Sequence, residues 1–217
     1  MKEYVRRGAA QCMGRWIAAI RTKWSSRIVA LSFLGSIASF AVADAHHPLI
    51  WQVSNESVMG LTSTKNDIVS ERHTLNAING GIDGKGQLSL ALDLSQIETN
   101  IPIRNERMQS WLFSAAPEAL VTAQIEQGVL SSTQSGTVEQ AVTVVANQQS
   151  VELRLPVEVT RSSPNEVRVA GQLMLDVAEL GFAPGIEKLR EIAGLKVIST
   201  RVPIDFELVF TRVPSSR

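Results

Sequence analysis

The chain has 217 residues, of which 44% are hydrophobic and 5% aromatic, with 21 basic residues balanced by 21 acidic ones and a single cysteine. These values are typical of a globular protein with one domain, or two small ones. They exclude a disulfide-rich scaffold, a strongly basic nucleic-acid binder and a membrane protein with several spanning helices.

The balanced charge hides two different regions. Residues 1–45 hold seven bases and two acids, whereas residues 46–217 hold 14 bases and 19 acids. Within the first region, residues 28–42 read IVALSFLGSIASFAV without a charge. This stretch is shorter than the roughly 20 residues of a spanning helix. A basic segment, a short apolar stretch and small residues together predict a signal peptide over residues 1–45. We therefore expect a periplasmic protein with no stable membrane span after cleavage.

The processing of this segment has alternatives. The small residues allow cleavage after Ala43 or after Ala45, and translation could begin at Met13. A retained signal anchor and a twin-arginine signal at Arg6-Arg7 are the competing interpretations. Cleavage would remove Cys12, which excludes thiol catalysis and cysteine-bound metals from the mature chain.

Cleavage after Ala43 would also place His46 third in the mature chain. A terminal amine, two amides and that imidazole form a nitrogen set suited to copper or nickel. The plainer interpretation is a polar terminus with no metal.

After residue 45 the apolar residues alternate with polar ones, which is typical of strands with one buried face. The strongest alternation covers 88–94, 151–159 and 202–210, and weaker versions cover 49–63, 66–79, 119–126, 137–146 and 166–177. Turn signals stand at Gly80-Gly81, Asp83-Gly84, Ser135-Gly136, Asn147 and Pro164-Asn165. We predict about eight antiparallel strands in one domain, residues 46–217, that form a barrel or a sandwich.

Prolines refine this prediction. Pro156 and Pro203 lie inside strand-like segments, where they cannot donate to a ladder and therefore indicate an edge, a bulge or a seam.

A short helix is predicted over residues 103–113, with Met108, Trp111 and Leu112 on its apolar side. A second helix is predicted over residues 184–193, between Pro184 and Gly194. Its buried stripe would be Ile186, Leu189, Ile192 and Ala193.

The segment 88–113, LSLALDLSQIETNIPIRNERMQSWLF, resembles the signature region of the YceI-like family. There a leucine-rich strand leads to an aspartate, a Ser-x-x-Thr-like turn and a short helix with Arg-x-x-Arg/His that ends in phenylalanine. This chain supplies Asp93, Ser95, Thr99, Arg104, Arg107, Met108 and Phe113. Further likeness lies in Ile50-Trp51 with Glu56-Ser57, in Ile78-Asn79-Gly80 with Ile82-Asp83, and in VPIDFELVF at 202–210. The likeness covers nearly all of 48–211.

Two parts of the chain depart from the family pattern. The Gly-x-Phe of the third strand region is replaced by Arg72-His73-Thr74-Leu75, and the mid-chain Leu-Thr-x-x-Gly is only loosely matched by residues 142–147. These departures concern the identity of the ligand more than the fold.

The resemblance implies a mainly β protein with a single extended antiparallel β-barrel of about eight strands, lipocalin-like, with two short helices. It also implies an exported lipid-binding protein that holds a polyisoprenoid or similar long-chain amphiphile in the barrel. The alternative is a non-enzymatic structural or interaction module of the periplasm whose barrel is filled by its own side chains. A homodimer remains open.

Arg104 and Arg107 are three residues apart and project from one side of the first helix. Planar guanidinium groups suit phosphate, so they could hold an anionic head group. Alternatively, Glu106, Glu98 or Asp93 pairs with them and they only dock the helix. The candidate ligand-binding residues are Leu88, Leu90, Leu92, Arg104, Arg107, Trp111, Phe113, Leu153, Leu155 and Phe206. The apolar candidates could equally form a plain core.

Nothing local predicts an enzyme. The sequence contains no phosphate loop, dinucleotide fingerprint or metal-spaced cluster. Nucleophilic catalysis needs a base that a third group holds in place, and His73 is the only histidine of the mature chain away from its start. We therefore expect neither a cofactor nor a nucleic-acid partner. A lipid ligand is what the resemblance to the family implies.

Overall fold

A computed structural model of the chain describes residues 48–131 and 135–214. These residues belong to one compact unit, Asp44–Arg217. The predicted signal peptide, its two cleavage sites, His46 and His47 all lie outside the described residues. Among the described residues, no helix is both long enough and apolar enough to cross a bilayer.

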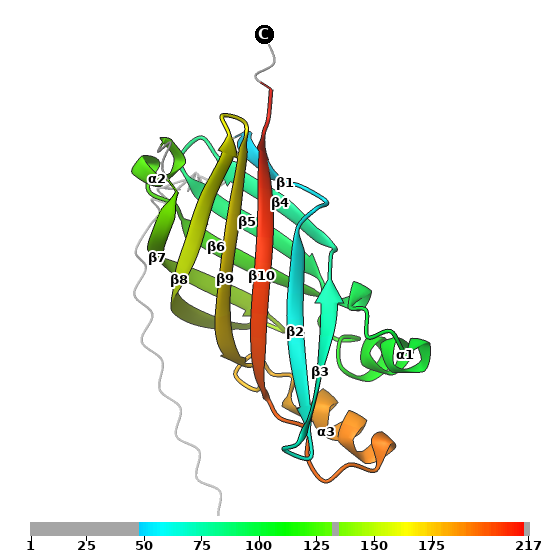
Figure 1. Cartoon of the computed structure of the whole chain (residues 1–217). Coiled ribbons are helices and arrows are strands. Elements are labelled where there is room, and N and C mark those ends of the chain that lie inside the picture. Colours follow the sequence, from blue (N-terminus) through cyan, green and yellow to red (C-terminus); the bar gives the residue numbers. More distant parts are fainter. Residues whose placement is uncertain (1–47, 132–134, 215–217) are drawn as a thin grey trace, which may run out of the picture. The chain divides into compact units, whose positions relative to one another are not determined.

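The alternating segments form ten antiparallel strands, eight of which close into a ring (Figure 1). The ring order is β1-β4-β5-β6-β7-β8-β9-β10, and pairing of β10 with β1 closes it. This confirms the predicted barrel. The bounds are β1 Leu49–Val53, β2 Val58–Lys65, β3 Val69–Leu75, β4 Ile78–Asp83, β5 Gln87–Asp93, β6 Glu118–Gln124, β7 Gly136–Ala146, β8 Gln149–Ser163, β9 Glu166–Asp176 and β10 Arg201–Arg212.

The structure has two strands more than predicted because two predicted strands each divide into two. The expected strand 49–63 divides into β1 and β2, and 66–79 divides into β3 and the start of β4. The long strand β10 pairs with β1 near Phe210 and with β2 near Ile204. The hairpin of β2 and β3 therefore extends the barrel wall beyond the end of β1.

A serine bridges the break between β1 and β2. The backbone amide of Val209 in β10 donates to Ser57 Oγ at 2.9 Å, and the same hydroxyl donates to the carbonyl oxygen of Val209 at 3.4 Å. Ser57 is 1% exposed. Its side chain therefore replaces the backbone partner that β10 lacks at this point.

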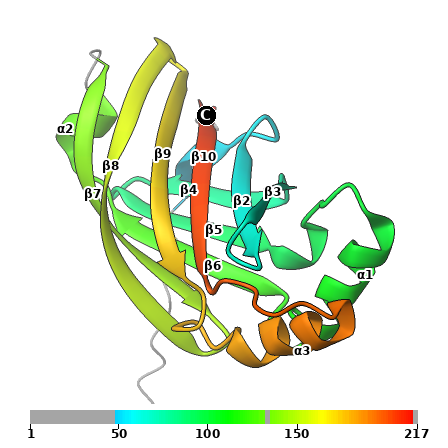
Figure 2. The same ribbon diagram turned by 60° about the horizontal axis from the view of Figure 1, so that its bottom comes forward.

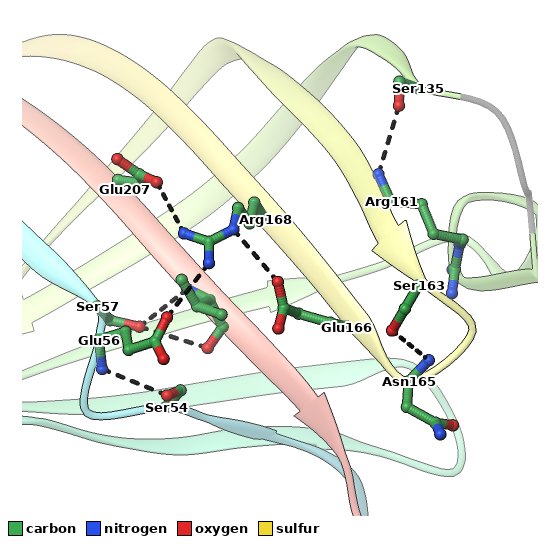
Figure 3. Close-up of polar contacts among 11 residues, drawn as sticks. Ser54, Glu56, Ser57, Ser135, Arg161, Ser163, Asn165, Glu166, Arg168 and Glu207 are labelled. Atoms are coloured by element: carbon green, nitrogen blue, oxygen red, sulfur yellow. Dashed lines mark hydrogen bonds and ion pairs between the residues drawn. The ribbon is translucent and has the colours of Figure 1, made fainter.

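Beside this break, an ion-pair network crosses the outer wall (Figure 3). Arg168 of β9 contacts Glu166 on its own strand, Glu207 of β10 and Glu56 of the β1–β2 turn. The groups are well exposed, so the network adds little stability. It does connect the three segments that meet at the seam.

The prediction of a turn at Gly80-Gly81 is wrong, because both glycines lie inside β4. A Cβ on Gly81 would lie 2.0 Å from the carbonyl oxygen of Trp51, and one on Gly80 would lie 2.1 Å from that of Ser89. The glycines are therefore needed because neighbouring strands approach β4 closely. The signals at 83–84, 147 and 164–165 do mark turns between strands.

The two prolines mark places where ladders begin. Pro156 stands directly before the β8–β9 ladder, which starts at Val157, and Pro203 stands directly before the β10–β2 ladder, which starts at Ile204. Each proline thus lies where its strand lacks a partner on one side, as the missing amide hydrogen requires.

Two of the helices lie side by side at one end of the barrel (Figure 2). They are α1, Pro102–Trp111, and α3, Ala183–Ala193, which ends at Gly194 with a φ of 63°. A short helix α2, Gln127–Ser131, and a 3-10 turn, Leu94–Gln96, were not predicted. In α3, Ile186 is buried as expected, but Ile192 and Ala193 are exposed. Leu189 is partly buried, so the buried stripe of α3 is narrower than predicted.

Candidate ligand-binding site

The inward faces of the strands enclose a cavity of about 560 Å³. Its wall is built from alternate residues of each strand, because successive side chains of a strand point to opposite faces. Most of them are leucine, valine and isoleucine, with Phe206 and Phe210 from β10. The volume lies in the range of cavities that hold small molecules, roughly 300–1,000 Å³.

The structure places seven of the ten candidate residues in the cavity lining. They are Leu88, Leu92, Arg104, Arg107, Phe113, Leu155 and Phe206. The remaining three do not line it. Leu90 is packed in the core at 2% exposure, Leu153 is partly buried against the core, and Trp111 is 50% exposed at the end of α1. Direct contact of any of these residues with a ligand stays a prediction.

A tryptophan lines the cavity away from α1 and α3. Trp51 of β1 is 4% exposed and belongs to the cavity lining. The guanidinium groups of Arg161 and Arg212 lie 5.4 Å and 5.9 Å from its ring centroid, within cation–π range. Trp51 was noted in the sequence only for its likeness to an opening strand, and alternation alone does not show that it lines a cavity.

The other end of the cavity carries a basic cluster, which we define as Lys65, Glu71, Arg104 and Arg107. Lys65 pairs with Glu71, and Arg104 Nη1 lies 2.9 Å from Glu71 Oε2. The hydrogen bond from Lys65, followed by the charges of Lys65 and Arg104, lowers the pKa of Glu71. The cluster therefore holds three cations and one carboxylate at the cavity edge.

This geometry corrects the alternative pairing for Arg104. Its partner is Glu71 of β3 and none of the three carboxylates named above. Glu98 instead accepts from Asn105 Nδ2, and Asp93 accepts from Ser95 Oγ. Arg107 makes no ion pair or side-chain hydrogen bond within the described ranges 48–131 and 135–214, and it is exposed. Its charge is therefore available to a ligand.

A histidine that sequence reasoning did not select also lines the cavity. His73 of β3 is 4% exposed, and its Nε2 lies 2.8 Å from Ser63 Oγ. Its Nδ1 is buried without a hydrogen-bond partner in the described part of the chain. Burial and, secondarily, the charge of Arg104 lower the pKa of His73, so the ring is neutral near pH 7. The sequence feature that could have pointed to His73 is the replacement of the family's Gly-x-Phe by residues 72–75 of this strand.

The contact between Ser63 and His73 is not a catalytic triad, because no third group holds Nδ1. Within the described ranges, no three histidine, cysteine or acidic side chains gather as a metal site. The arrangement suits the binding of an amphiphile, with an apolar chamber and a basic edge.

Comparisons with known proteins found similar folds among solved structures only. No family model and no curated protein matches the chain. Among solved structures, the chain is similar to a polyisoprenoid-binding domain from Saccharophagus degradans implicated in plant cell wall breakdown. The two share 29% identity and a TM-score of 0.73, over 76% of this chain and 100% of that one.

Two more distant structures have been matched. BcnA from Burkholderia cenocepacia has 14% identity and a TM-score of 0.56, over 72% of this chain and 98% of that one, and it shows the fold alone. A mutant CJ YceI protein has 10% identity and a TM-score of 0.45, over 70% of this chain and 85% of that one. It is too distant to support an inference.

Proposed function

We propose that this chain, a member of the YceI-like family by its fold and sequence pattern, binds one long-chain amphiphile such as a polyisoprenoid lipid in its barrel. The observation that carries the proposal is the apolar cavity of about 560 Å³ with a basic edge. The similar domain from Saccharophagus degradans is described as polyisoprenoid-binding.

The binding energy would come from transfer of an apolar tail out of water. Burial contributes roughly 25 cal/mol for each Å² of apolar surface, less the cost of ordering the tail. The wall offers leucine, valine and isoleucine side chains over its length. Since a cavity remains inside the barrel, the alternative of a barrel filled by its own side chains is less well supported.

The ligand we infer has an anionic head group, such as a phosphate. Lys65, Arg104 and Arg107 outnumber the single carboxylate of Glu71 at the cavity edge, and His73 adds no charge while it is neutral. Arg107 is the cation with no partner among the described residues, so it can bind an anion without first breaking an ion pair.

We further propose that the protein is exported by the predicted signal peptide and carries its ligand through the periplasm without converting it. The support for export is the charge and apolar pattern of residues 1–45. The support for a carrier is the site itself, whose described residues offer apolar walls and cations but no nucleophile and base that a third group holds in place.

The test is a titration with two ligands of equal chain length, a long-chain prenyl phosphate and the matching prenyl alcohol. We compare the wild type with Arg107→Gln. Hydrogen bonds to charged groups contribute about 1.5–3 kcal/mol, so the variant should bind the phosphate roughly tenfold to a hundredfold more weakly. Its affinity for the alcohol should be unchanged.

Arg154→Gln is the matched control. Arg154 lies on the outward face of β8, is exposed and does not line the cavity. Equal affinity of wild type and Arg107→Gln for the phosphate would contradict the head-group role. Failure of the wild type to bind either ligand would contradict the binding function as a whole.

A further inference from the structure

Most of the exposed large apolar side chains of the described residues lie at one end of the barrel. Nine such side chains are exposed, and six of them lie on or beside α1, α3 and the β2–β3 turn. They are Ile68, Val69, Ile101, Ile103, Trp111 and Ile192. We call this set the apolar end. Ile68 is 85% exposed, the highest value of the nine.

Hydrogen bonds hold the β2–β3 turn beside the loop that follows α3. The amide of Asn66 donates to the carbonyl of Val197 at 2.9 Å, and Asn66 Oδ1 accepts from the amide of Lys196 at 2.8 Å. Figure 1 shows the turn and α3 at the same end of the barrel. The turn that carries Ile68 is therefore fixed against the loop that follows α3, while the Ile68 side chain faces solvent.

The two helices of the apolar end are packed closely. A Cβ on Gly185, near the start of α3, would lie 2.7 Å from the carbonyl oxygen of Trp111 at the end of α1. Only a glycine permits this approach, and Figure 2 shows the two helices side by side at the end of the barrel. The apolar end is thus a firm surface made of three connected segments.

The cavity reaches the surface at the same end. Four residues that line the cavity are also exposed, namely Ile101, Ile103, Arg107 and Ala193. All four lie on α1 or α3 or directly before α1. The other lining residues of the described chain are buried or partly buried. The opening of the cavity is therefore bordered by side chains of the apolar end.

Cations lie among these apolar side chains, together with acidic residues of α3. The ammonium group of Lys188 lies 5.7 Å from the ring centroid of Trp111 and 3.3 Å from Glu191 Oε2. Arg107 on α1 and Lys196 in the loop that follows α3 are also exposed. The pairing of an exposed tryptophan with lysine and arginine is typical of side chains that sit at a membrane–water interface.

We propose that the apolar end docks onto the surface of an anionic phospholipid bilayer, so that the ligand passes between bilayer and cavity without crossing water. This inference rests on the proposed function, because only an amphiphilic ligand needs such a path. Apolar side chains on three connected segments, with cations beside them, suit a fluid lipid surface.

The test is vesicle flotation of the unit Asp44–Arg217, whose strands close on themselves. The vesicles contain phosphatidylethanolamine with phosphatidylglycerol, and vesicles of phosphatidylcholine alone serve as the neutral comparison. The test variant is Ile68→Ser with Ile192→Ser, since neither residue lines the cavity. The control is Leu49→Ser with Met174→Ser, exposed at 38% and 49% on β1 and β9.

Wild type and control should float with the anionic vesicles. The test variant should bind these vesicles with an affinity at least about tenfold lower. Trp111 reports the contact directly, because Trp51 is the only other tryptophan of this unit and is buried. Its emission should shift to the blue with anionic vesicles and the shift should weaken in salt. Equal flotation of both variants, or no flotation of the wild type, would overturn the proposal. So would binding of the apolar end to an envelope protein with no affinity for vesicles.

The same proteins separate this inference from the proposed function. Offered prenyl phosphate from solution, the test variant should bind it as tightly as the wild type, while its transfer from vesicles slows. A wild type that floats but takes up no amphiphile would contradict the proposed function and leave the docking surface standing. A wild type that binds prenyl phosphate but does not float would contradict the docking surface alone.

Discussion

Replacement of Ser57 by alanine tests how the barrel closes. The hydroxyl of Ser57 accepts from the amide of Val209 at 2.9 Å, where β10 passes from its pairing with β1 to its pairing with β2. Both residues are 1% exposed. Ser57→Ala therefore leaves a buried amide without a partner and with no access to water.

An unsatisfied buried donor costs about 1–3 kcal/mol. In a domain of this size, 1 kcal/mol shifts the melting temperature by roughly 2–4 °C, so Ser57→Ala should lower Tm by about 2–12 °C. The matched control is Ser163→Ala in the β8–β9 turn. There the serine hydroxyl accepts from the amide of Asn165 at 3.1 Å in an exposed setting, where water can replace it (Figure 3). Its effect should stay within about 0.5 kcal/mol.

Thermal and urea unfolding followed by circular dichroism measure both variants, and amide hydrogen exchange locates the effect. We expect the amide of Val209 to exchange faster in Ser57→Ala than in the wild type, with little change at the β8–β9 turn. If Ser57→Ala and Ser163→Ala lose the same stability, the serine does not substitute for a missing strand partner.

Two further predictions concern the cavity end. The pKa of His73 is lowered in the folded state, so the unfolded chain takes up the proton first and stability should fall as the pH drops below about 6.5. His73→Gln should flatten this dependence between about pH 6.5 and 5, above the range where Glu71 titrates, and an unchanged Tm-against-pH slope would contradict it. Gly185→Val should push α3 away from Trp111, at a cost of roughly 1–3 kcal/mol, and speed ligand release. A dissociation rate equal to that of the wild type would show that the contact between the helices does not guard the opening.

Much of the barrel could be predicted from the sequence because alternation is a local property. The faces of β5, β8 and β10 follow from their leucine, valine and phenylalanine spacing, and the helix ends follow from Pro102 and Gly194. The break between β1 and β2 falls at four consecutive polar residues, 54–57, which the prediction included in one continuous strand. Nothing local shows that β10 changes partner at Ser57. The glycines of β4 were misassigned for a similar reason, since their role depends on strands distant in sequence.

The site was less predictable than the fold. Inward-facing leucines and valines have the same pattern whether they fill a barrel or line a cavity, so periodicity cannot reveal the volume that remains. The partner of Arg104 is Glu71, which lies 33 residues away and reaches it through the β3 edge. Trp111 has the spacing of an inward-facing residue on α1, but of that predicted side only Met108 and Leu112 line the cavity, and Trp111 is half exposed.

The most direct test of the central claim is native mass spectrometry of the processed protein, purified from its own host and followed by solvent extraction. We predict a mass increase that corresponds to one long-chain amphiphile per chain, and recovery of that molecule in the organic phase. A protein that arrives empty and stays empty after incubation with a long-chain prenyl phosphate would contradict the account. The barrel would then have to serve as a structural module, and its cavity of about 560 Å³ would need another explanation.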